Sequence, residues 1–158
     1  MGLETVHPEI LPRLNKRMSL DSFARAADRL LKSAIALRAF VLVKPPFLRE
    51  EEAVEWAVRS IEFAFDCGAT AVSLIPTRSG NGALDALADV GDFAAPRLSR
   101  LESAHDAGIR LQRGRVFADL WDLERFASCR HCFAPRLARL RETNLQQIYL
   151  PRVQCDYC

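Results

Sequence analysis

Segments with the features of β-strands recur through the first half of the chain at intervals of about 34 residues, the length of one strand-helix unit. They cover Gly2 to Val6, Ile35 to Val43 and Thr70 to Ile75, and amphipathic helical patterns over residues 20–31 and 50–65 lie between them. This alternation predicts right-handed crossovers and a parallel sheet. The periodicity leaves open whether the sheet is doubly wound or curved into a barrel. In both cases ligands meet the carboxyl ends of the strands.

Residues that begin and end helices lie between these segments and support the assignment. The regular alternation of strands and helices changes after residue 77. Ser19 is a suitable N-cap for the first long helix, and Gly68 is a suitable terminator for the second. Beyond residue 77 we expect a short helix over residues 83–88 and a second helix that begins at Pro96 and ends at Gly108. Short strands are expected over residues 109–111 and 115–120.

Length and charge exclude several classes of protein. The 158 residues provide for one ordinary domain, and no apolar run approaches the roughly 20 residues that a membrane-spanning helix needs. The first residues form no cleavable signal, so we expect a cytoplasmic protein without membrane contact. Residues 1–96 carry 11 basic and 13 acidic groups, whereas residues 97–158 carry 11 and 7. The last third is therefore a basic segment on a mildly acidic body.

Four of the five cysteines form two C-x2-C pairs separated by 22 residues. The odd total and the lack of a signal argue against disulfides. Two such turns brought together present four sulfur atoms in a tetrahedron, which suits zinc, and four thiolates also suit an iron–sulfur cluster. Unliganded thiols are the third interpretation. The predicted ligands are Cys129, Cys132, Cys155 and Cys158, whereas Cys67 reads as a small core residue.

Arginines surround these cysteine pairs. A basic, metal-stapled module could hold a phosphate backbone, with Phe133 or Tyr149 stacking on a base, so we predict RNA as a partner; the alternative is a solvated arginine-rich face. The predicted RNA-binding residues are Arg136, Arg139, Arg141 and Arg152.

Several short segments carry a resemblance to a known family: residues 2–5 (GLET), 9–11, 15–16, 23–27, 40–46 (FVLVKPP) and 73–77 (SLIPT). They occur in the order found in radical S-adenosylmethionine (radical SAM) enzymes. The chain resembles the branch that contains the Elongator catalytic subunit and the archaeosine-forming tRNA enzymes.

The resemblance implies an α/β fold in which these strands are the fourth to sixth of a partial (β/α)6 barrel. It divides the chain into the C-terminal half of the barrel (1–77), an α/β extension (78–128) and a cysteine-rich metal-binding extension (129–158). It also implies S-adenosylmethionine as cofactor, cleaved by a reduced [4Fe-4S] cluster to a 5′-deoxyadenosyl radical.

The resemblance places Glu4 where the family holds the ribose or the amino-acid end of the cofactor. It places the other cofactor-binding positions in loops that lie against the cofactor: Thr5, Lys44, Pro45, Pro46, Pro76 and Thr77. The alternative for Glu4 is a capping or surface carboxylate, and for Lys44 a solvated side chain.

The C-x3-C-x2-C loop that holds the family's cluster does not occur in this sequence. We therefore expect a fragment of a radical SAM enzyme, inactive alone, with the [4Fe-4S] cluster in an N-terminal part and a nucleic acid such as tRNA as the parent's substrate. The alternatives are a stand-alone zinc-stapled RNA-binding module and a degenerate structural domain. No nucleophile elbow, P-loop or G-x-G-x-x-G sequence suggests other chemistry. We expect His7 in a turn and His105 on the exposed side of a helix.

Overall fold

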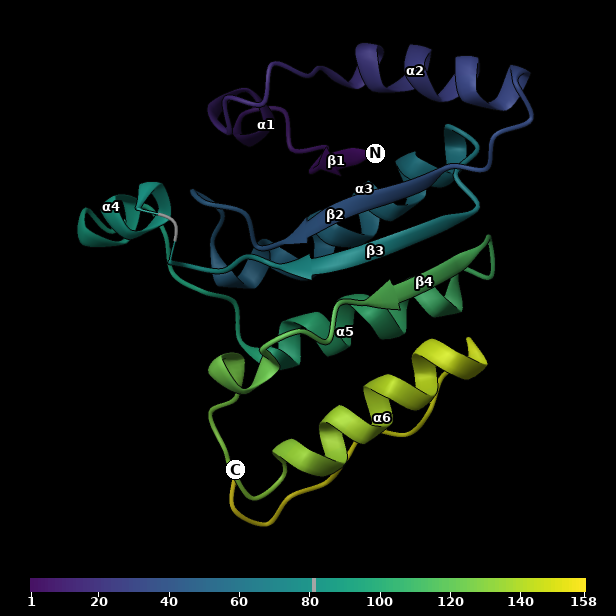
Figure 1. The fold of residues 1–158 in the computed structure, drawn as a ribbon. Helices are drawn as coiled ribbons and strands as arrows, with labels where there is room; N and C mark the ends of the chain where they lie inside the picture. The colour runs from purple at the N-terminus through teal and green to yellow at the C-terminus, as the bar shows by residue number, and fades with distance from the viewer. Residues whose placement is uncertain (81) are drawn as a thin grey trace.

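The computed structural model describes residues 1–80 and 82–158, and its strands and helices alternate along the chain (Figure 1). Ser19 caps the first long helix as expected: its hydroxyl accepts a hydrogen bond from the backbone N–H of Ser22, and the hydroxyl of Ser22 accepts one from Ser19 in return. In chain order, with η for a 3-10 helix, the elements are β1 (Gly2–Glu4), α1 (Ile10–Arg13), α2 (Leu20–Lys32), β2 (Arg38–Val43), η1 (Glu50–Glu52), α3 (Ala53–Asp66), β3 (Ala71–Pro76), α4 (Ala83–Asp89), α5 (Leu98–Arg110), β4 (Arg115–Ala118), η2 (Leu123–Phe126) and α6 (Phe133–Gln146).

The strands form one four-stranded parallel sheet in the order β1-β2-β3-β4, which confirms the predicted parallel pairing. Each strand lies beside the strand that precedes it in the chain, so the order does not reverse as it does in a doubly wound sheet. This is the strand order of one arc of a β/α barrel, although the described residues close no barrel. Because β4 pairs with β3, the sheet extends beyond residue 77.

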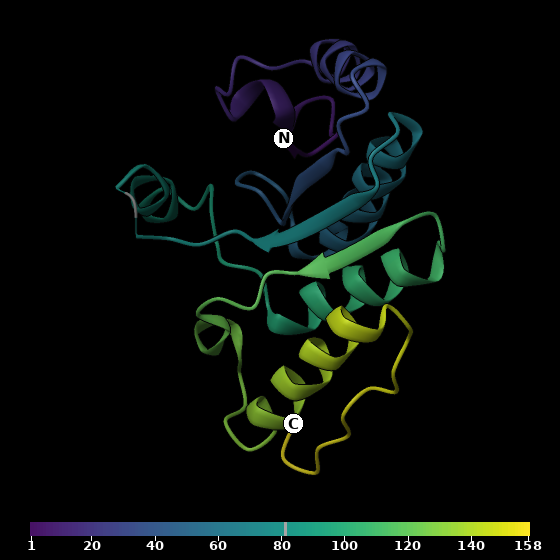
Figure 2. The ribbon, with the colours of Figure 1, turned by 45° about the vertical axis from the view of Figure 1, so that its right-hand side comes forward.

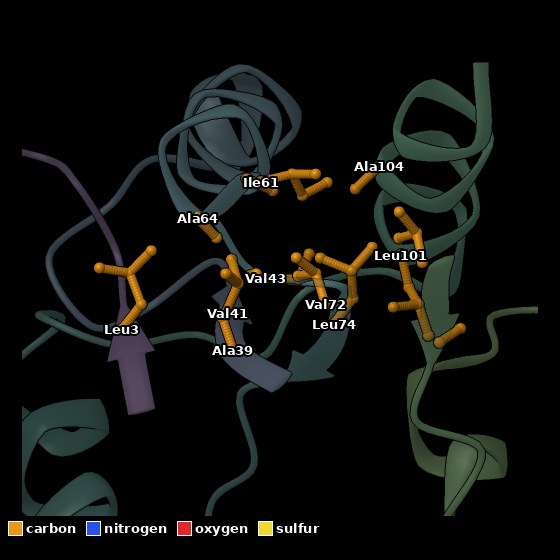
Figure 3. Close-up of a cluster of buried hydrophobic side chains, with 14 of the residues drawn as sticks. Leu3, Ala39, Val41, Val43, Ile61, Ala64, Val72, Leu74, Leu101 and Ala104 are labelled. Carbon is orange, nitrogen blue, oxygen red and sulfur yellow. The ribbon is translucent and has the colours of Figure 1, made fainter. Parts of the chain in front are cut away.

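The core lies between one face of the sheet and helices α3 and α5. Figure 3 shows Val41 of β2 and Leu74 of β3 directed toward the side where Ile61 of α3 and Leu101 of α5 lie. All four side chains are buried within one hydrophobic cluster. Full burial of such a side chain contributes about 1.5–3 kcal/mol, so this layer is a main source of stability.

The opposite face of the sheet carries polar as well as apolar side chains and is only partly covered. Phe40 of β2 points to that face and is 41% exposed, and the Arg38 guanidinium lies 4.8 Å from the ring centre of Phe117 on β4. Within the described residues, Figures 1 and 2 show no helix over the middle of this face. All-parallel sheets in stable proteins are usually covered on both faces, so this exposed face is unusual for a parallel sheet.

Three expectations for residues 96–111 were wrong. Helix α5 begins at Leu98, two residues after Pro96, and it runs on to Arg110. The backbone over residues 109–111 therefore completes a helix instead of forming a strand. Gly108 lies inside α5. A side chain is disfavoured there, because a Cβ would stand 2.9 Å from Ile61 Cδ1 and 3.0 Å from Val116 Cγ1. The glycine permits close packing of α5 on the sheet; it does not end the helix.

Side chains of α6 close the edge of the sheet at β4. Asn144 accepts a hydrogen bond from the backbone N–H of Ala118 and donates one to its carbonyl, both at 2.9 Å. Gln147, just after α6, does the same for Val116 at 2.8 and 3.1 Å. These two amides take the positions of a neighbouring strand, so β4 offers no free edge there.

Candidate metal centre and strand-end cavity

The four cysteines predicted as ligands gather at one point of the structure. Their sulfur atoms all lie within 4.8 Å of one another, with 3.9 Å between Cys129 and Cys155 and 3.7 Å between Cys132 and Cys158. The segment after α6 runs back beside that helix, and the C-terminus lies near the first turn of α6 (Figures 1 and 2). This return brings the second pair onto the first. The group can hold a metal ion such as zinc or an iron–sulfur centre.

Hydrogen bonds within the cluster shift the pKa of two of these thiols. The backbone N–H of Cys132 is the largest influence on Cys129, and it lowers the pKa of that thiol to about 7. The sulfur of Cys132, followed by those of Cys155 and Cys129, raises the pKa of Cys158 to about 12. Metal ions bind cysteine as the thiolate, and the charge of a bound cation offsets the repulsion between neighbouring thiolates. The donor set therefore fits a metal.

The remaining cysteine and the histidine between the first pair are not part of the sulfur cluster. Cys67 follows α3 and is half-buried against the core, as expected for a small apolar residue. His131 is exposed, and its ring stacks on Tyr157. Sulfur atoms alone make up the candidate centre.

Ion pairs join the cysteine module, residues 129–158, to helix α5. Arg136 makes two hydrogen bonds to the Glu102 carboxylate, at 3.1 and 2.6 Å. Asp106 accepts from Arg139 at 2.6 Å and from Arg152 at 3.0 Å. Glu102 and Asp106 were not paired with these arginines in the sequence analysis, because α5 brings both carboxylates from a distant part of the chain.

These ion pairs leave some of the arginines predicted to bind RNA less available for a phosphate. Arg139 is 6% exposed and also donates to the carbonyls of Leu150 and Pro151, so its hydrogen bonds are directed inward. Arg136 is half-buried in its pair with Glu102, whereas Arg152 keeps an exposed side chain. Arg141 is exposed and makes no ion pair among the residues that the structure describes.

His105 lies in the same region and was wrongly expected at the surface. Its ring is fully buried, and Nε2 donates to the carbonyl of Val116 at 3.0 Å. Burial lowers the pKa of His105, and the nearby Arg139 lowers it further, whereas the hydrogen bond to Val116 and the charge of Asp106 oppose the shift. The ring is a neutral core group that faces β4.

A cavity of about 530 Å³ opens at the carboxyl ends of β1, β2 and β3. Ligand pockets commonly have volumes of about 300–1,000 Å³, so its size suits a small molecule. Four of the seven predicted cofactor-binding residues line it: Glu4, Pro46, Pro76 and Thr77. Glu4 lies 3.8 Å from the Lys16 amine, and its backbone has a positive φ of 65°.

The other three predicted residues lie outside this cavity. Thr5 is buried and accepts a hydrogen bond from the backbone N–H of His7. The Lys44 amine is buried, donates to the carbonyl of Ala94 and lies 3.9 Å from Glu50, so it is not solvated. Pro45 is buried as well. Lys44 lines a separate cavity of about 510 Å³, and burial lowers the pKa of its amine.

The cavity wall includes cationic residues that sequence reasoning missed. Lys16 belongs to residues 15–16, one of the segments that resemble radical SAM enzymes, so the sequence offered a reason to consider it. Nothing in the sequence indicated that Arg13 and Arg78 would line the same cavity. Arg78 pairs with Asp119, just after β4, at 2.8 Å and lies 5.0 Å from the ring centre of Trp121. It thus connects the ends of β3 and β4 at the rim of the cavity.

No helix among the described residues is long and apolar enough to cross a membrane. No known protein-family model matches the chain, and no solved structure matches it. Archaeosine synthase subunit beta of Methanosarcina acetivorans is 30% identical over 99 residues, which are 61% of this chain and 28% of that protein. The chain thus spans less than a third of that relative's length. Over part of its sequence, it is similar to a protein of the archaeosine-forming group.

Proposed function

We propose that this chain is the S-adenosylmethionine-binding half-barrel of a radical SAM enzyme whose complete form modifies tRNA or another nucleic acid. The observation that carries the proposal is the cavity at the ends of three parallel strands, whose wall includes both Glu4 and Thr77. The partial likeness to archaeosine synthase subunit beta supports the choice of family. In this reading residues 1–77 are the C-terminal half of the barrel, residues 78–128 extend it and residues 129–158 form the metal-binding module.

The two edges of the sheet support an incomplete barrel. The amides of Asn144 and Gln147 occupy the edge at β4, so strands cannot be added there without displacing α6. At the other edge, no described strand pairs with the outer side of β1. Further strands would join at β1 and curve round, so that their inward side chains would enclose the open face that Phe40 lines.

Within the cavity, this chain's residues bind and orient the cofactor. The Glu4 carboxylate can accept two hydrogen bonds from ribose hydroxyl groups, and the Lys16 amine lies 3.8 Å from it. Thr77 donates to the carbonyl of Val43, which fixes the turn after β3, and Pro46 and Pro76 give a rigid apolar wall. A reduced [4Fe-4S] cluster would supply the electron that cleaves the cofactor. The five cysteines offer no C-x3-C-x2-C set for it, so this chain alone is proposed to be inactive.

At the cysteine centre we propose a single zinc ion. Zinc–sulfur bonds of about 2.3 Å in a tetrahedron separate the sulfur atoms by about 3.8 Å. The two measured separations of 3.7 and 3.9 Å agree with that value. In a four-iron cluster each thiolate binds a different iron atom, so the sulfur atoms must stand farther apart. Metal analysis should find about one zinc per chain in a colourless protein; iron with acid-labile sulfide would contradict this assignment.

Isothermal titration calorimetry of the metal-loaded chain with S-adenosylmethionine tests the cavity. We expect binding, and we expect Glu4→Gln to weaken it about tenfold, because a hydrogen bond to a charged group contributes about 1.5 kcal/mol or more. The matched control is Glu9→Gln, an exposed carboxylate outside the cavity, which should bind as the wild type does. No binding by the wild type, or equal binding by Glu4→Gln, would overturn the proposal.

A further inference from the structure

Two aromatic rings stack on each other at the surface of the cysteine module. The rings of His131 and Tyr157 have centroids 4.2 Å apart and planes inclined by 15°. Each residue occupies the third position of its own C-x2-C turn. Both side chains are exposed, and Tyr157 is 74% exposed. The stacked pair therefore stands outside the core, where it buries little apolar surface.

We propose that His131 and Tyr157 form a platform on which an unpaired base of RNA stacks. This inference rests on the proposed function, because it supplies the nucleic-acid contact that the proposed parent enzyme requires. A base has a flat π-face and adds to the stack without a specific hydrogen-bonding pattern. Bases within a duplex already stack on their neighbours, so the platform selects single-stranded segments, loops or ends.

The charges around the platform favour this occupant. Of the four arginines expected to contact RNA, Arg136 and Arg139 are committed to Glu102 and Asp106. Arg130 adjoins His131, is exposed and makes no ion pair within the described part of the chain. Asp156 adjoins Tyr157, so the phosphate backbone would pass on the His131 side. Arg130 is thus the cation best placed to meet a phosphate.

The platform depends on the metal. His131 belongs to the first cysteine pair and Tyr157 to the second, and the sulfur cluster is what holds the two turns together. Without a metal, four thiols do not hold these turns in register. Chelation should therefore separate the rings and abolish RNA binding, even where the sheet remains folded.

The test is fluorescence anisotropy of the full, zinc-loaded chain with a short labelled single-stranded RNA of mixed sequence and with its duplex. The double variant His131→Ala/Tyr157→Ala should bind the single strand about tenfold more weakly or worse, because stacking of one base contributes about 1–3 kcal/mol, which corresponds to roughly 5-fold to 150-fold. The variant His131→Phe/Tyr157→Phe should retain binding. Metal content and far-UV circular dichroism confirm that each variant is folded.

Trp121→Ala is the matched control, because Trp121 is an exposed aromatic residue outside the cysteine module. It should bind RNA as the wild type does. Wild-type affinity in the double alanine variant, or a loss caused only by Tyr149→Ala at the other exposed ring of the module, overturns the inference and leaves the cofactor cavity unaffected. No RNA binding by the wild-type chain also overturns it, whereas failure of the cavity proposal appears separately in the calorimetry with S-adenosylmethionine.

Discussion

Asp106 offers the sharpest test of how the cysteine module is attached to the sheet domain. This carboxylate is 1% exposed and accepts hydrogen bonds from Arg139 of α6 and from Arg152 of the returning segment. Asp106→Ala leaves the Arg139 guanidinium, 6% exposed, without its counter-charge. Removing one partner of a buried ion pair costs about 3–5 kcal/mol. That is a large part of the 5–15 kcal/mol by which a domain is typically stable.

Urea unfolding of the metal-loaded protein, followed by far-UV circular dichroism, measures this loss. The matched control is Asp28→Ala, which breaks the exposed pair of Asp28 with Lys32 on α2 and should change the free energy of unfolding by no more than about 0.5 kcal/mol. If Asp106→Ala lowers the free energy of unfolding by less than about 1 kcal/mol, Arg139 forms hydrogen bonds to another residue or to water in the variant. The ion pairs would then not be what attaches the module to α5.

Three further predictions concern the edge strand, the buried histidine and the metal. Asn144→Ala should lower the free energy of unfolding by about 2 kcal/mol, because it leaves the N–H and carbonyl of Ala118 unpaired. The exposed edge of β4 should then self-associate, which size-exclusion chromatography would detect. The pKa of His105 is lowered in the folded protein, so the unfolded chain binds the proton more readily. The free energy of unfolding should therefore fall as the pH drops below about 6.5. Urea titrations of His105→Gln should show a weaker dependence on pH. Chelation of the metal should increase amide hydrogen exchange in residues 129–158 and leave β2 and β3 protected; uniform exchange would show that the module and the sheet unfold together.

The sequence was sufficient to predict features that depend on local patterns. The strands at β2 and β3 follow from apolar runs bounded by prolines and glycines, and the cysteine centre follows from the spacing of two short turns. The order of the strands in the sheet could not be predicted, because pairing between distant segments leaves no periodic signal.

The wrong predictions share a physical cause. Gly108 resembles a helix terminator in sequence, but Ile61 and Val116 press against it and make it a packing position. His105 is a polar residue next to Asp106 and was expected on the exposed side of its helix, yet the carbonyl of Val116 gives its ring a partner in the core. In each case a residue distant in the chain sets the environment. The same holds for Glu102, which neutralises Arg136 from another helix.

The position of the cofactor site is the central claim, and a nuclear magnetic resonance titration of isotope-labelled protein with S-adenosylmethionine tests it most directly. The account predicts that the backbone signals that shift belong to the residues around the strand-end cavity, Glu4, Ile75 and Thr77 among them. Signals from the second cavity, around Phe93 and Ala94, should not move, and neither should those of the cysteine module. Shifts confined to those two regions, or no shifts at a saturating concentration, would contradict it.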